Sequence, residues 1–86
     1  MQRGWVVSPG YRAAIGALKE VRMGRGISQR ELARRLGKPP SFVNKIEQLE
    51  RRLDILEYIA IAEAMGLKAD VLLAQLRAVL PETVAI

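Results

Sequence analysis

The feature that most constrains the fold is the stretch 27–47, which reads as two short helices joined by a tight turn. Ser28 can cap the first helix, and Glu31 stands three residues later, where it can complete a capping box. Gly37 then supplies the left-handed residue that ends this helix and opens the turn. The pattern predicts a helix over about 29–36, followed closely by a second helix.

The second helix of this pair, predicted over about 40–48, separates an apolar face from a polar one. Val43 and Ile46 form an inward pair at helical spacing. The opposite face is polar and almost free of negative charge, and its members recur at i, i+3, i+4 and i+7: Ser41, Asn44, Lys45 and Gln48. Such a face suits contact with base edges in a DNA groove.

These residues resemble the helix-turn-helix of phage repressors and Cro, a family also called XRE-like. The resemblance covers about 11–73, and the residue types that match the family pattern are Gln29, Ala33, Gly37, Val43 and Glu47. It implies a compact, all-α, five-helix fold like that of lambda repressor, with the third helix in the major groove. The family usually has Gly two residues after the position of Glu47. This chain has Leu49 there, so the helix either runs on or ends in a different turn.

Side-chain chemistry and the resemblance together give the candidate DNA contacts. Lys45 suits the O6/N7 edge of guanine and Asn44 the N6/N7 edge of adenine, although a lysine arm also reaches phosphate. Gln29, at the start of the predicted helix over 29–36, is expected to contact a phosphate. Ser41 fits a base, a phosphate or only its own helical turn, while Pro40 offers apolar contact alone. The remaining candidates are Gln48, Arg51 and Arg52, the two arginines being either phosphate contacts or solvated charges.

The resemblance also implies an internal ion pair between Arg22 and Glu47. A bidentate guanidinium–carboxylate contact would fix the angle between the helix that carries Arg22 and the helix predicted over about 40–48. The alternative is two unrelated surface charges.

Charge and composition favour the same class of protein. The 86 residues carry a net charge of +5, with about +7 over residues 1–38 and about −2 over the remainder. A basic first half is the electrostatic pattern of a phosphate-binding surface. The chain has neither Cys nor His, which excludes disulfides and the usual zinc sites, and we expect no cofactor. Without His to activate a serine or threonine, an enzyme is not expected.

Three further helices complete the prediction. One follows Ser8-Pro9 and runs to about Met23. The next is capped by Asp54, with Glu57 at N3 to form a capping box, and is stopped by Gly66. The last is expected to be capped by Asp70 and ended by Pro81. In the fourth helix the inward stripe is expected to begin with Leu56, Ile59 and Ala60 and to continue with Ala62 and Met65. The only strand signal is Val6-Val7.

These elements predict an N-terminal arm over 1–8, a domain over 9–80 with its helix-turn-helix at about 28–48, and a tail over 81–86. Because the fifth helix has more apolar positions than a small core needs, we expect a homodimer interface there. The expected members are Val71, Leu72, Leu76, Val79 and Leu80. The alternatives are that they complete the monomer core, or that the interface lies at Trp5-Val6-Val7.

The sequence therefore predicts a cytoplasmic, sequence-specific regulator of transcription, such as a repressor, that binds double-stranded DNA at an inverted repeat as a homodimer. The alternative is an antitoxin-type interaction module that neutralises a toxin partner and binds DNA secondarily. A controller of a restriction–modification operon is a third reading within the regulator class.

Overall fold

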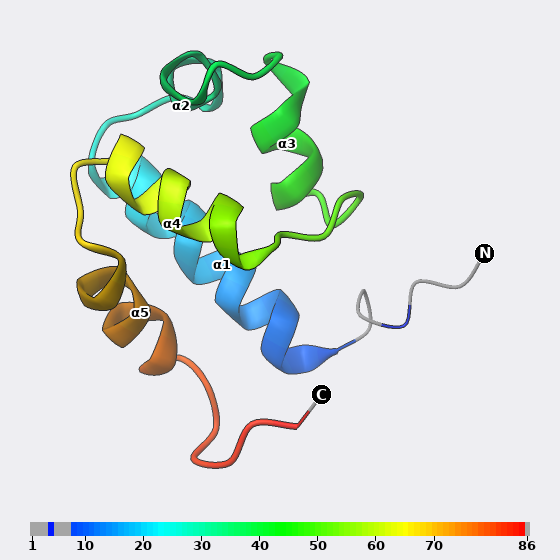
Figure 1. The fold of residues 1–86 in the computed structure, drawn as a ribbon. Helices are drawn as coiled ribbons and strands as arrows, with labels where there is room; N and C mark the ends of the chain where they lie inside the picture. The colour runs from blue at the N-terminus through cyan, green and yellow to red at the C-terminus, as the bar shows by residue number, and fades with distance from the viewer. Residues whose placement is uncertain (1–3, 5–7, 86) are drawn as a thin grey trace.

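Five helices form the protein, seen in a computed structural model that describes Gly4 and residues 8–85. They are α1 (Pro9–Gly24), α2 (Gln29–Leu36), α3 (Ser41–Glu47), α4 (Ile55–Ala64) and α5 (Ala69–Arg77). α2 and α3 pack together at one end of the molecule, and α5 lies at the other end against α1 and α4 (Figure 1). The predicted all-α, five-helix fold is confirmed. The Val6-Val7 strand signal and nearly all of the expected arm lie outside the described residues.

Helix starts follow from the capping residues. Ser8 Oγ accepts the Tyr11 N–H at 3.3 Å, and Ser28 Oγ accepts the Glu31 N–H at 3.0 Å. Asp54 and Glu57 form a full capping box at the start of α4, in which each side chain accepts the backbone N–H of the other residue.

The starts of α3 and α5 differ from the prediction. α3 begins at Ser41, after Pro40 in helical backbone without a side-chain cap. α5 begins at Ala69, and its N-cap is Lys68, so the expected Asp70 cap is wrong. Asp70 lies in the first turn instead, where its carboxylate interacts favourably with the helix dipole. The same helix ends at Arg77, before Pro81.

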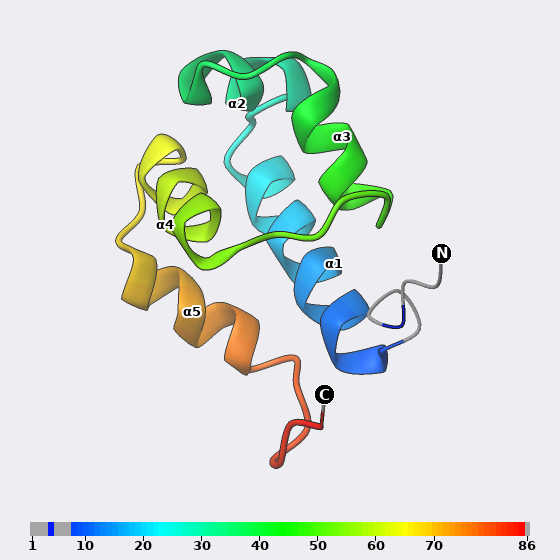
Figure 2. The same ribbon diagram turned by 45° about the vertical axis from the view of Figure 1, so that its right-hand side comes forward.

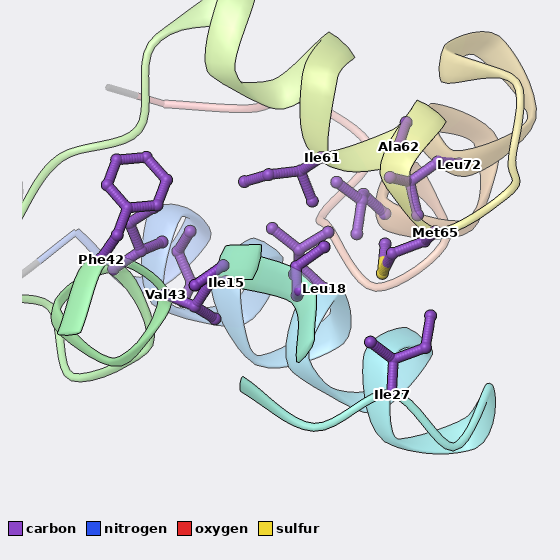
Figure 3. Close-up of a cluster of buried hydrophobic side chains, with 13 residues drawn as sticks. Ile15, Leu18, Ile27, Phe42, Val43, Ile61, Ala62, Met65 and Leu72 are labelled. Atoms are coloured by element: carbon purple, nitrogen blue, oxygen red, sulfur yellow. The ribbon is translucent and has the colours of Figure 1, made fainter. Parts of the chain in front are cut away.

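One hydrophobic core joins all five helices (Figure 3). Its buried members are Ile15, Leu18, Ile27, Leu32, Ala33, Phe42, Val43, Ile46, Ile61, Ala62, Met65, Leu72 and Leu76. Phe42 lies at one end of the cluster and Ile27 at the other, with side chains from α1 and α4 between them. Burying each large side chain contributes about 1.5–3 kcal/mol, so this cluster holds α3 in place against α1 and α2.

The face that α4 buries was predicted only in part: Ala62 and Met65 are buried as expected, but the first three residues of the predicted stripe are not. Leu56 is 74% exposed and Ile59 is 36% exposed, and Ala60 is exposed as well. The inward residues are instead spaced i, i+3, i+4 and i+7: Tyr58, Ile61, Ala62 and Met65. α4 is apolar nearly all round, so its periodicity does not select a face. Its rotation is fixed by tertiary contacts, including the Tyr58 hydroxyl that donates to the Ala69 carbonyl at 2.6 Å.

Two residues expected at a dimer interface belong to the core of the single chain. Leu72 is 0% exposed and Leu76 is 7% exposed, because α5 lies with this side against α1 and α4. Leu72 is therefore wrong as an interface residue, and Leu76 is mainly a core residue. Val71 and Val79 remain about half exposed, and Leu80 is half-buried.

Two arginines tie helix ends to the last turn of α4. Arg25 Nε donates to the Met65 carbonyl at 2.7 Å, and Arg35 Nη1 donates to the Ala64 carbonyl at 2.9 Å. Within the described residues, no helix combines the length and apolar character needed to cross a membrane.

Candidate nucleic-acid interface

The outer face of α3 is polar because its apolar residues are used by the core. Val43 and Ile46 are buried beneath the helix. Ser41, Lys45 and Gln48 are exposed and Asn44 is half-buried. The helix itself lies beside α2 at one end of the molecule (Figure 2).

Pro40 and Phe42 have different environments at the start of α3. Pro40 is exposed at the N-cap position. Phe42 is buried, and two cationic groups lie over its ring: Lys38 Nζ is 5.5 Å and Arg51 Cζ is 4.8 Å from the ring centre. These cation–π contacts hold two positive side chains near the start of α3.

Arg22 and Glu47 form a buried ion pair between α1 and the end of α3. Arg22 Nε donates to Glu47 Oε2 at 2.7 Å and Nη2 donates to Oε1 at 3.0 Å. Arg22 Nη1 also donates to the Ile27 carbonyl at 2.7 Å. Because their side chains are only 9% and 5% exposed, the planar contact is shielded from water and fixes the orientation of α3.

The Gln29 side chain has two partners inside the protein. Its Nε2 donates to Glu47 Oε1 at 2.7 Å, and its Oε1 accepts from Asn44 Nδ2 at 3.3 Å. The amide expected at a phosphate thus faces α3. Sequence reasoning missed this contact because the partners lie 18 and 15 residues along the chain.

Arg51 is paired within the protein as well. Its Nη1 and Nη2 donate to the two carboxylate oxygens of Glu57 at 2.8 and 2.6 Å. These bonds raise the pKa of Arg51 and lower that of Glu57. Arg52 is exposed, with its guanidinium 5.7 Å from the Tyr11 ring centre. Glu57 signalled its capping role in the sequence but not its pairing with Arg51.

The loop after α3 closes with Leu49 in the left-handed conformation, at φ 62°. The Leu49 N–H donates to the Ile46 carbonyl at 3.1 Å, and the Glu50 N–H to the Lys45 carbonyl at 2.8 Å. These two bonds make a Schellman motif, the helix ending that glycine usually occupies. Leu49 therefore stops α3 where a glycine would, and its half-buried side chain packs on the core.

The exposed end of α2 carries a small charge cluster. Glu31 accepts from Arg34 at 2.9 and 2.6 Å and from Arg35 at 2.8 Å. Hydrogen bonds from Arg34, which has the larger effect, and from Arg35 lower the pKa of Glu31 from 4.5 to about 2. Glu31 thus uses its carboxylate on these arginines, and only the Ser28 half of the expected capping box is formed. Among the described residues, no group of acidic side chains gathers as a metal site.

Comparison with known proteins agrees with this geometry. The family described as Helix-turn-helix matches residues 18–72. A solved structure, an XRE-family like protein from Pseudomonas syringae pv. tomato str. DC3000, is 44% identical and superposes with a TM-score of 0.75. The match covers 84% of this chain and 88% of that one. No curated protein is significantly similar to the chain.

Proposed function

The chain belongs to the XRE-like family of helix-turn-helix DNA-binding regulators, and we propose that it binds an inverted repeat in double-stranded DNA as a homodimer. The observation that carries this proposal is the outer face of α3, where exposed Ser41, Lys45 and Gln48 flank Asn44 above a buried apolar face. α3 would enter the major groove, with α2 across the backbone.

Each candidate contact has a role that its environment supports. Exposed Lys45 would donate to guanine O6/N7, and Pro40 would touch a thymine methyl. At the start of α2 the backbone N–H of Gln29 remains suited to a phosphate, while its side chain supports α3. Arg52, which is exposed, and Arg51, which holds the Glu57 carboxylate, both remain phosphate candidates after α3.

The function is tested by selecting bound duplexes from a random DNA pool and measuring the dissociation constant of the recovered site against salt. An inverted repeat is expected, with a log–log salt slope of about −0.9 per phosphate neutralised. Lys45→Ala should cost about 1–3 kcal/mol and relax one base position in each half-site.

The control is Arg77→Ala, which removes one positive charge from α5, a helix that packs on α1 and α4. It should leave the base preference unchanged. A flat salt dependence, or a pool without any recovered sequence, would refute DNA recognition. Equal loss on every sequence would make Lys45 a phosphate contact.

The homodimer is supported by a groove between α4 and α5. Its volume is about 480 Å³, and it is lined by Ile55, Tyr58, Ile59, Ala69, Asp70, Leu73 and Leu76. Ile55 and Leu73 are 75% and 56% exposed, and Leu56, the residue after Ile55 in α4, is 74% exposed. Contiguous apolar exposure of this kind marks an interaction site. A second copy would cover it through a self-complementary two-fold contact, which shares only Leu76 with the interface expected from the sequence.

Ile55→Glu tests this interface without disturbing the fold, since Ile55 is exposed in the first turn of α4, where an acidic side chain is favourable. The variant should sediment as a monomer and lose affinity for the full repeat far more than for a half-site. Val79→Glu, at an exposed residue outside the groove, is the matched control. An Ile55→Glu variant that remains dimeric would move the interface elsewhere.

A further inference from the structure

A chain of hydrogen bonds runs from the buried ion pair to the DNA-facing side of α3. Arg22 donates to Glu47, Gln29 Nε2 donates to Glu47 Oε1 at 2.7 Å, and Asn44 Nδ2 donates to Gln29 Oε1 at 3.3 Å. The four residues come from α1, α2 and α3, and this series of hydrogen bonds ends at Asn44 of α3.

The buried Arg22–Glu47 pair decides which group donates and which accepts in each of these hydrogen bonds. A guanidinium only donates hydrogen bonds, and an ionised carboxylate only accepts them. Gln29 must therefore turn its NH₂ group toward Glu47, which leaves Oε1 facing Asn44. Asn44 must in turn give one N–H to that oxygen. What remains on Asn44 for DNA is the carbonyl oxygen Oδ1 and the second N–H.

This remaining set discriminates between bases. In the major groove adenine and cytosine present an exocyclic amino group, whereas guanine and thymine present a carbonyl oxygen. An oxygen held toward the groove accepts from an amino group and is repelled by a carbonyl. Adenine also offers N7 as an acceptor for the second N–H, so it should be preferred over cytosine.

We propose that Gln29 is a positioning residue that locks the Asn44 amide so that α3 selects an amino-bearing base, adenine before cytosine, at one position of each half-site. The inference rests on the proposed DNA-binding function and adds to it the base class and the residue that enforces it. Without Gln29 the Asn44 amide could rotate by half a turn. Its NH₂ group would then donate to the carbonyl oxygen of guanine or thymine with equal ease.

The test measures relative affinities for duplexes that carry each of the four bases at the position that Asn44→Ala relaxes. The wild type should favour adenine or cytosine over guanine or thymine by about fivefold or more. Gln29→Met, which keeps the length of the side chain but removes its amide, should abolish most of that preference and leave the position read by Lys45 unchanged. Adding Asn44→Ala to Gln29→Met should change the preference little further. Gln75→Met, the same substitution at an exposed residue of α5, should leave all preferences intact.

Other results would overturn the inference. Gln29→Met could weaken all four duplexes by one common factor, which would assign Gln29 to phosphate binding or to general stability. A wild-type preference for guanine or thymine at this position would also refute it. A wild type without any sequence preference would refute the proposed function itself, and this inference with it.

A second measurement needs no variant. In the wild-type protein the Asn44 side-chain amide protons should exchange with water more slowly than those of Gln75, because one of them is bonded to Gln29. Equal exchange rates for the two side chains would overturn the proposed lock.

Discussion

Replacing Arg22 with Met should be among the most destabilising single changes in this protein, because it strands a buried carboxylate. Glu47 would lose both of its guanidinium bonds and keep only the bond from Gln29. The Ile27 carbonyl would also lose its donor. Removing one partner of a buried pair typically costs about 3–5 kcal/mol.

That cost is large on the scale of the whole domain. At about 0.05–0.15 kcal/mol per residue, a chain of this length has a total stability of roughly 4–13 kcal/mol. For a domain of this size about 1 kcal/mol shifts the melting temperature by roughly 4–8 °C, so Arg22→Met should lower it by about 12–40 °C. Adding a stabilising osmolyte such as sucrose keeps the variant folded enough to measure.

The decisive comparison is a double-mutant cycle with Glu47→Leu, read by urea denaturation. With both charges gone, the principal buried defect is the Ile27 carbonyl, a loss of about 1–3 kcal/mol. Gln29 also loses its bond to Glu47, but its half-buried amide can turn to water. The double variant should therefore be at least about 3 kcal/mol more stable than the sum of the singles implies. The exposed pair of Glu31 and Arg34 serves as a control and should show far weaker coupling. Additive losses at Arg22 and Glu47 would refute the reasoning.

The remaining predictions concern pH, backbone strain and the dimer. Because Arg34 and Arg35 hold the pKa of Glu31 below its ordinary 4.5, Glu31 should stabilise the fold above pH 4.5 and lose this contribution as the pH falls toward about 2. NMR titration of its carboxyl should give a pKa near 2, and a midpoint at 4.5 would contradict the cluster. At Leu49, where φ is 62°, Leu49→Gly should be about 1 kcal/mol more stable than Leu49→Ala in thermal melts, the reverse of the usual order. If Ala is the more stable of the two, the position carries no strain. Leu73→Glu, in the α4–α5 groove, should give a monomer in analytical ultracentrifugation while circular dichroism stays unchanged; a dimer would exclude the groove.

The features that could be predicted from the sequence depend on local chemistry. The Ser28 cap, the Asp54–Glu57 capping box and the left-handed Gly37 are decided within four residues of the chain, and the structure contains all three. They fixed the helix-turn-helix register, and with it the exposed row on α3.

What could not be predicted depends on groups far apart in the chain. The start of the buried face of α4 was predicted wrongly because most positions in 55–64 are apolar, and only packing against α2 and α5 distinguishes Leu56 from Ile61. Gln29 was placed at a phosphate because its helix position allows it. Its actual partners, Glu47 and Asn44, approach only once α2 and α3 are packed.

The separation of α5 from the helix-turn-helix bears on how the protein can be extended. α2 and α3 occupy one end of the molecule, while α5 and residues 78–85 occupy the other in both views (Figures 1 and 2). A fluorescent reporter or an activation segment grafted after residue 85 would emerge on the side away from α2 and α3. With a spacer long enough to clear the α4–α5 groove, such a cargo would leave the outer face of α3 unobstructed.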